Sequence, residues 1–355
     1  MKNKLTKIGL SALCGSLAAV TAVNSGELAV TGGATMTHTS EAGATTGNPF
    51  GMASSVTFTG NGELDNGTTF KAVFAATDQD AYSSGSISLT FPSMGSLTLS
   101  QADGGGGIDQ FDDAMPTAWE ETDGTGVTVG HDKISGVGAS MNIHYKSPTF
   151  AGTNSFIALA YSPNNDGTMV NDKASSGSTN VKNEGWDAAI NLNPTLGTDV
   201  LSGLNIFAGY SHTSQDPANK SAGTNGDARA DVEEGVAGFT YAIGPVTVGL
   251  QRSVEYLGNE QATGGVWGYG NTAYGVSFNV NDNLSISYGM SESKKGFVSQ
   301  EYNETVIGEA ESIQIAYTVG GASIKIAETD VDNGSYTTGT TKDKEATTIA
   351  LSLAF

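Results

Sequence analysis

The sequence predicts an all-β protein, a closed antiparallel barrel of sixteen strands that spans a membrane. Two patterns carry this prediction. Beyond residue 26, short stretches alternate between apolar and small polar side chains, and clusters of Gly, Asn, Asp and Pro separate them. The connections between these stretches alternate between short and long, as the turns and loops of membrane barrels do. Helical periodicity is almost absent.

The first 25 residues are predicted to be an export signal rather than part of the barrel. Three lysines precede an apolar run over residues 8–23, which is too short and too rich in small residues for a spanning helix. Cleavage is expected after Ser25, with cleavage after Ala22 as the alternative. The only cysteine, Cys14, lies in this segment. Residues 26–355 are therefore expected to form one barrel domain without disulfides.

The composition is acidic and only moderately apolar. The chain has 37 acidic and 16 basic residues and a net charge of −21, so nucleic acid is not expected as a partner. Hydrophobic residues make up 38%, and no stretch beyond the signal approaches the length of a spanning helix. A barrel keeps hydropathy low because its apolar residues alternate with polar ones. The 48 glycines are mixed with aromatic and β-branched residues, which makes disorder the weaker interpretation.

Sixteen strands are predicted in chain order, each bounded by turn residues. They cover 27–38, 53–60, 68–76, 82–92, 96–101, 138–146, 155–162, 185–192, 203–211, 235–243, 246–256, 272–280, 284–291, 311–319, 322–329 and 346–355. Long loops are predicted at 39–52, 102–137, 163–184, 212–234, 257–271, 292–310 and 330–345, with a shorter one at 77–81. Short turns fill the other connections, which places both chain ends on one side of the membrane.

Alternation within the strands assigns the side chains to two faces. One row is apolar, as at Tyr274 and Phe278, and is expected to face lipid or a neighbouring subunit. The opposite row is small and polar, as at Ser285 and Ser287, and is expected to face a water-filled lumen. A soluble β-sandwich would bury its apolar row instead. Arg252 falls on the outward row, where an arginine at mid-membrane costs roughly 2–4 kcal/mol, so a bulge, an interfacial depth or a subunit contact is needed to accommodate it.

The predicted loop 102–137 is a candidate constriction of the lumen. A diffusion pore needs a wide barrel that is narrowed at one point, where size and charge are both selected. The glycine run 104–107 gives this loop a flexible entry that lets its backbone bend inward. Its candidate acidic residues are Asp109, Asp112, Asp113, Glu120 and Glu121. The alternative is that these carboxylates are solvated and face outward, as most loop charges do.

Three lysines on the predicted inward rows are candidates for a basic pore wall. They are Lys71, Lys146 and Lys325. Opposed acidic and basic rows would create a transverse field that orients polar solutes. The outer loops are predicted to add further acids, among them Glu233, Glu234, Glu309 and Glu345. A negative mouth predicts a weak to moderate cation preference.

The sequence requires no cofactor and predicts no enzyme. Clustered loop carboxylates can hold Ca²⁺, which prefers oxygen ligands, so calcium remains a candidate accessory. Residues 104–112 match a single calcium-binding β-helix repeat, but such a solenoid needs several copies. The four histidines are scattered and have no cysteine partners, so a transition-metal site is not expected. Hydrolase, Walker and dinucleotide motifs are absent from the sequence.

The strand number, the long third loop and the terminal Phe355 together resemble the trimeric general porins of Gram-negative bacteria, particularly the alphaproteobacterial, Rhodobacter-like type. The most specific part is Ile108 to Glu121, IDQFDDAMPTAWEE, which is similar to the short helical stretch of the constriction loop in that family. The terminal strand ending in Phe355 resembles the signal that the outer-membrane assembly machinery recognises. The family often carries a cluster of arginines on the pore wall. This chain departs from that pattern, because its only arginines are Arg229 and Arg252 and neither is well placed for such a cluster.

This resemblance implies a homotrimer in the outer membrane, surrounded by lipid and lipopolysaccharide, that passes small hydrophilic solutes and ions. Two alternatives stay open. A substrate-specific channel would line its lumen with aromatic side chains, and the inward rows offer few beyond Phe207. A surface adhesin or structural barrel would use its acidic loops, but small inward residues at sixteen strands favour an open lumen.

Overall fold

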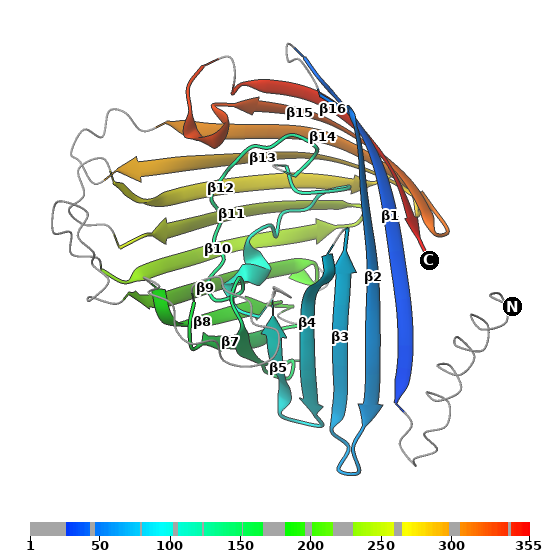
Figure 1. Ribbon diagram of the computed structural model, residues 1–355, viewed down its shortest axis with the longest axis vertical. Helices are drawn as coiled ribbons and strands as arrows, with labels where there is room; N and C mark the ends of the chain where they lie inside the picture. Colours follow the sequence, from blue (N-terminus) through cyan, green and yellow to red (C-terminus); the bar gives the residue numbers. More distant parts are fainter. Residues whose placement is uncertain are drawn as a thin grey trace, which may run out of the picture.

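The computed structural model shows one closed antiparallel barrel of sixteen strands, each paired with its neighbours in sequence (Figure 1). The structure describes residues 26–42, 47–78, 80–101, 106–122, 124–150, 152–165, 182–195, 201–215, 230–258, 265–297, 306–339 and 342–355. The predicted export signal, 1–25, lies outside the described residues. Within the described ranges, no helix has both the length and the apolar character that a membrane crossing needs.

All sixteen predicted strands are confirmed, and most extend further toward the loops than the sequence indicated. Their bounds are β1 Glu27–Glu41, β2 Phe50–Glu63, β3 Thr69–Thr77, β4 Asp80–Phe91, β5 Gly95–Gln101, β6 Asn142–Lys146, β7 Phe156–Ser162, β8 Lys182–Leu192, β9 Leu204–Gln215, β10 Val232–Ile243, β11 Val246–Tyr256, β12 Val266–Asn279, β13 Leu284–Phe297, β14 Ile307–Val319, β15 Ala322–Asp332 and β16 Lys344–Ala354. Two single turns of 3-10 helix, η1 Ile108–Phe111 and η5 Gly334–Tyr336, lie in connections.

The barrel closes where the last strand pairs with the first. The backbone N–H of Gly32 donates to the carbonyl of Phe355 at 2.7 Å, and Phe355 N–H donates back at 2.9 Å. A Cβ at Gly32 would lie 2.6 Å from the Phe355 ring, so the glycine lets this ring pack closely on the first strand. Closure removes the open sheet edges that would otherwise expose unpaired backbone groups.

The two predicted faces are confirmed. On β16, Ile349, Leu351 and Leu353 are 43–48% exposed, whereas the intervening Thr348 and Ala350 are fully buried. The apolar row therefore points away from the barrel axis. An exterior that is apolar around its circumference suits a hydrocarbon surrounding rather than water.

Two details of the sequence prediction are wrong. Residues 138–141 are not part of the predicted strand 138–146; they form a turn, in which Ser140 N–H donates to the carbonyl of Val137 at 3.2 Å. Four acids assigned to outer loops lie in strands instead, because ladder pairing continues beyond the apolar stretch and does not depend on apolar side chains. They are Glu233 and Glu234 on β10, Glu309 on β14 and Glu345 on β16.

Candidate functional site

The connection between β5 and β6 lies against the inner face of the barrel. We call residues 106–141 the inner segment, of which 123 is not described. Ala118 N–H donates to Ser287 Oγ at 2.8 Å, and the amides of Trp119 and Glu120 donate to Gln314 Oε1 at 3.0 and 3.1 Å. Ser287 and Gln314 belong to the inward rows of β13 and β14. Figure 1 shows the segment, in cyan to green, inside the ring of strands.

Two buried carboxylates on the barrel wall hold both ends of the inner segment. Asp187 Oδ2 on β8 accepts hydrogen bonds from the amides of Ile108 and Val137 at 3.1 and 3.2 Å. Glu234 Oε2 on β10 accepts from Ser135 and Gly136 at 2.7 and 3.0 Å. Charged acceptors make stronger hydrogen bonds to amides than neutral ones do. Sequence analysis missed both residues as functional candidates, although Asp187 occupies an inward position of a predicted strand.

Glycine is needed where Asp187 approaches the inner segment. A Cβ at Gly107 or Gly136 would lie 1.8 or 2.3 Å from Asp187 Oδ2. Gly136 also has a φ of +53°, a conformation that glycine adopts without steric cost. The glycines of this loop therefore let two distant parts of the chain share one carboxylate.

Apolar side chains anchor the inner segment at two further points. Near its start, Ile108 and Phe111 pack against Phe207 and Val236 of the wall, and the Phe111 and Phe207 rings stack at 4.8 Å. The apolar contacts of the return stretch, residues 124–131, form a separate cluster consisting of Val127, Val129, Ala310, Val331 and Ala346. Phe207, the aromatic predicted to face the lumen, is covered by the segment and is only 2% exposed.

The inner segment covers the inward rows of β8–β11 and β13–β16 and leaves the wall of β1–β3 open. Beneath it, the inward side chains of Ser312 and Gln314 are 1% exposed. On the opposite wall, the inward Ser55 and Lys71 are exposed. A recess of ≈440 Å³ lies along this open wall and includes Thr35, Ser55, Lys325 and Ser352 among its lining residues. The free cross-section thus lies beside β1–β3.

Three of the predicted acids form a group near the start of the inner segment. Asp109 lies in η1 and Asp112 directly follows it, and the amide of Asp112 donates to the Asp109 carbonyl at 3.1 Å. Burial, together with the charges of Asp113 and Asp109 and against the opposing charge of Lys133, raises the pKa of Asp112 to about 7. Asp112 is therefore a carboxyl that changes charge near neutral pH.

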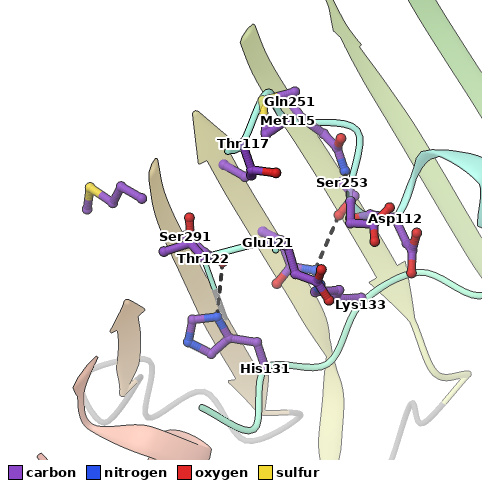
Figure 2. Close-up of a pocket in the computed structure, with 14 residues that line it drawn as sticks. Asp112, Met115, Thr117, Glu121, Thr122, His131, Lys133, Gln251, Ser253 and Ser291 are labelled. Atoms are coloured by element: carbon purple, nitrogen blue, oxygen red, sulfur yellow. Dashed lines mark hydrogen bonds and ion pairs between the residues drawn. The ribbon is translucent and has the colours of Figure 1, made fainter. Parts of the chain in front are cut away.

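A small polar recess lies between this acid group and strands β11–β13 (Figure 2). Gln251 Nε2 donates to the Asp112 carbonyl at 3.1 Å, and Asn271 Nδ2 donates to the Asp132 carbonyl at 2.8 Å. His131 Nδ1 lies 3.1 Å from Ser291 Oγ. The recess has a volume of ≈40 Å³, which is enough for about one water molecule. These contacts fix the segment backbone to the wall.

The other two predicted acids, Glu120 and Glu121, lie beside two lysines. Burial and the hydrogen bond to Glu121, against the opposing charge of Lys325, raise the pKa of Glu120 to about 7. The hydrogen bond with Glu120, supported by Lys133 at 3.7 Å, lowers the pKa of Glu121 below its usual value. Lys133 was not among the predicted basic residues, because it lies in a loop and has no strand parity to assign it.

The three predicted wall lysines lie on inward rows but do not converge. Lys325 Nζ lies 5.7 Å from the centre of the Trp119 ring and is next to Glu120. Lys146 Nζ lies 3.7 Å above the Phe156 ring. Lys71 is exposed on β3 and forms no ion pair within the described residues. The structure therefore brings Lys325 to the acids and leaves Lys71 on the open wall.

The negative charge of the inner segment is expected to rise with pH across neutrality. A carboxyl whose pKa is about 7 is mostly neutral at pH 6 and mostly ionised at pH 8, so Asp112 and Glu120 add negative charge over this interval. We expect the cation-to-anion permeability ratio, measured from reversal potentials in a salt gradient, to increase roughly twofold to fivefold. The variant Asp112→Asn/Glu120→Gln is the control and should show a flat profile. An equally steep profile in this variant would assign the titration to other groups.

Comparison with solved structures shows that this fold is that of porins. The barrel superposes on OmpF of Salmonella typhi, solved as a complex with daunomycin, with a TM-score of 0.63 at 12% identity, covering 92% of this chain and 97% of that one. A porin refined at 1.8 Å gives 0.62 at 16% identity, with coverage of 93% and 100%. A mutant of the Rh. blastica porin gives 0.54 at 14% identity, again covering 93% and 100%. No protein-family model and no curated protein sequence matches the chain.

Proposed function

We propose that the protein is an outer-membrane diffusion channel for small hydrophilic solutes and ions rather than an enzyme. The observation that carries this proposal is that the inner segment covers part of the lumen wall and leaves the polar wall of β1–β3 open. A segment fixed inside a wide barrel reduces the free cross-section at one level, which is how such a pore filters by size. The proteins that share its fold include named porins.

Charge selection in this proposal follows from the placement of the inner segment. Asp109, Asp112, Asp113, Glu120 and Glu121 act as the acidic side of the constriction. Lys325 supplies positive charge beside these acids, Lys71 supplies it on the open wall, and Lys146 supplies it on β6. Acids outnumber these lysines, so the channel prefers cations weakly to moderately.

The assembled protein is proposed to be a homotrimer in the Gram-negative outer membrane, exported by a signal over residues 1–25. Lipid and lipopolysaccharide surround it, and the assembly machinery recognises the terminal strand. The exposed Phe355, which pairs with Gly32 only when the barrel closes, supports this role for the C-terminus. Crosslinking in outer membranes followed by mass determination should give three chains.

Planar-bilayer recording of residues 26–355 tests the proposal. We expect large, ohmic conductance steps that close in threes, with a cation-biased reversal potential in a salt gradient. Conductance that saturates with one solute would identify a substrate-specific channel instead. A folded, heat-modifiable barrel that leaves the bilayer silent would favour an adhesin or structural barrel and overturn the proposal.

The wall lysines give a charge test of the same channel. Lys325→Glu places a third carboxylate beside Glu120 and Glu121, so we expect the cation-to-anion permeability ratio to rise about threefold or more. Lys71→Glu should raise it less, because Lys71 forms no ion pair with an acid in the described part of the chain. Arg252→Gln removes a charge from the outer face and should leave the reversal potential unchanged. Equal reversal potentials in all three variants would remove the lysines from the conducting path.

Calcium binding at the loop carboxylates stays a prediction. Among the described residues, no group of three or more His, Cys, Asp or Glu side chains lies close enough to hold a metal ion. A pair of neighbouring carboxylates can also attract a divalent cation. The expected calcium site is therefore the pair Asp112 and Asp113 or the pair Glu120 and Glu121. Isothermal titration of the chelator-treated barrel with Ca²⁺ checks it, with Asp112→Asn/Asp113→Asn as the comparison.

A further inference from the structure

A row of hydroxyl groups crosses the seam where the barrel closes. Thr318 on β14 pairs with Ser323 on β15, which pairs in turn with Ser352 on β16. Ser352 then pairs with Thr35 on β1. Ser323 lies two positions from the inward Lys325, so the whole row of paired residues faces the lumen. We call these four residues the hydroxyl row.

The hydroxyl row lies just beyond the part of the wall that the inner segment covers. Gln314, which accepts two amides of the segment, is 1% exposed, whereas Thr318, further toward the short turn, is exposed. On β16, Thr348 is fully buried and Ser352 is only partly buried. The row is therefore open to the lumen on the side of the inner segment that faces the short turns.

The recess of ≈440 Å³ on the open wall follows the hydroxyl row. All four residues of the row line it, and Ser55 and Thr77 add two hydroxyls one row further. Among the described residues that line it, Lys325 alone is charged, and the neighbouring Glu120 offsets this charge. A recess that is rich in hydroxyls and nearly without net charge suits a neutral polar ligand better than an ion.

The hydroxyl row retains hydrogen-bonding capacity. Thr35 Oγ1 donates to Ser352 Oγ at 2.9 Å, which leaves the hydroxyl hydrogen of Ser352 for another partner. The side chains of Thr318 and Ser323 form no hydrogen bond within the described part of the protein. Each hydroxyl is both a donor and an acceptor, as the hydroxyls of sugars are. Adjacent strands lie about 4.8 Å apart, so the row is roughly 14 Å long, which exceeds one sugar ring.

An aromatic ring lies beside the cation of this recess. The centre of the Trp119 ring is 5.7 Å from Lys325 Nζ, and Lys325 lines the recess together with Ser323. Trp119 is only partly buried, so part of its side chain is open to a solute. Aromatic rings pack well on the apolar face of a sugar ring. The sequence showed few aromatics on the inward rows because Trp119 comes from the inner segment and not from a strand.

We propose that the hydroxyl row and Trp119 form a binding subsite for short neutral oligosaccharides that pass through the lumen. The sugar hydroxyls exchange hydrogen bonds with the row, a sugar ring packs on Trp119, and Lys325 donates to a sugar oxygen. Binding is weak, with a dissociation constant on the order of 10 mM, because both partners give up hydrogen bonds to water. The row does not read the configuration of a sugar, so it retains a class of solute. This inference rests on the proposed diffusion channel.

Block of the ion current by sugars tests the subsite. Residues 26–355 are recorded in planar bilayers in potassium chloride with increasing maltose, cellobiose or sucrose, and each conductance is divided by the conductivity of its solution. We expect all three disaccharides to lower this ratio, with half-maximal block on the order of 10 mM. A methyl-capped polyethylene glycol of equal mass accepts hydrogen bonds but donates none, and it should leave the ratio unchanged.

Matched variants separate the subsite from the rest of the lumen, each compared with its own current without sugar. Ser323→Ala/Ser352→Ala should raise the half-blocking concentration at least about fivefold, because it removes two hydrogen-bonding groups. Trp119→Ala should raise it similarly, and Trp119→Phe, which keeps an aromatic face, should restore most of the block. The control Thr57→Ala/Thr59→Ala removes two inward hydroxyls of β2 outside the recess and should leave the value unchanged.

Equal block of Ser323→Ala/Ser352→Ala and the intact chain, or equal block by the capped polyethylene glycol, would overturn the inference. A preference of more than about tenfold for one disaccharide would identify a substrate-specific channel and overturn it as well.

Tryptophan fluorescence of the detergent-solubilised barrel gives a readout that needs no open channel. Maltose should change the emission of the intact chain, and this change should disappear in Trp119→Phe. A silent barrel whose emission still responds to maltose would refute the proposed channel and support the subsite. A barrel that conducts normally but shows neither block nor an emission change would refute the subsite alone.

Discussion

Replacement of both wall carboxylates, Asp187→Ala/Glu234→Ala, is expected to release the inner segment from the barrel wall. Each carboxylate accepts two buried amide hydrogen bonds, and all four amides lose their acceptor in this variant. An unsatisfied buried donor costs about 1–3 kcal/mol. The equilibrium between docked and undocked segment should therefore shift by at least about a hundredfold toward the undocked state. The barrel itself remains closed, since its ladder does not depend on these groups.

Trypsin provides the readout, because Lys133 lies in the inner segment and its side chain is only 26% exposed when the segment is docked. When the segment redocks faster than trypsin cleaves it, the cleavage rate after Lys133 should increase by the same factor as the equilibrium population of the undocked segment. Open-channel current noise should rise in parallel. The matched control, Asp187→Asn/Glu234→Gln, keeps an oxygen acceptor at each position and should be cleaved far more slowly. Resistance of the alanine variant to cleavage would show that the apolar contacts alone hold the segment.

The fold was accessible from the sequence because strand alternation and turn residues are local signals. Tyr274, Val276 and Phe278 reveal their strand and its outward face without reference to any other part of the chain. The alternating lengths of turns and loops then fix the antiparallel order and the even strand number. The same locality explains the boundary errors: Glu233 and Glu234 read as loop because the apolar alternation begins only at Val236, while the backbone ladder begins at Val232.

The candidate site was accessible only in part. Parity correctly placed Lys325 and Lys71 inside, and the acid-rich stretch identified the inner segment. The contacts that hold the segment leave no local signal in the sequence. Asp187 and Gln314 accept hydrogen bonds from amides that are 50 to 195 residues away in the chain. A lone inward carboxylate looks the same in sequence whether it faces water or caps a loop. The glycines at 107 and 136 were a signal, since both must lack a side chain to admit Asp187.

Removal of the apolar anchor of the return stretch, Val127→Ser/Val129→Ser, is expected to release the other side of the inner segment. Both valines are at most 4% exposed and pack on Ala310, Val331 and Ala346. Each loses a buried side chain worth about 1.5–3 kcal/mol, so cleavage after Lys133 should accelerate by about a hundredfold or more. Thr128→Ala, between them and exposed, is the control and should have no effect.

Combining the two anchor variants decides whether the inner segment moves as one unit. The carboxylate anchor and the valine anchor hold different parts of the segment and share no side chain. If docking is all-or-none, both losses act on one equilibrium and their free energies add until the segment is fully undocked. If each part opens alone, the valine variant already exposes Lys133 and the carboxylate loss adds little to its cleavage rate. If the two free-energy losses add, the inner segment docks and undocks as a single unit. If they do not add, the inner segment consists of two parts that are fixed independently. Only the part that bears Glu120 and Glu121 then faces Lys325.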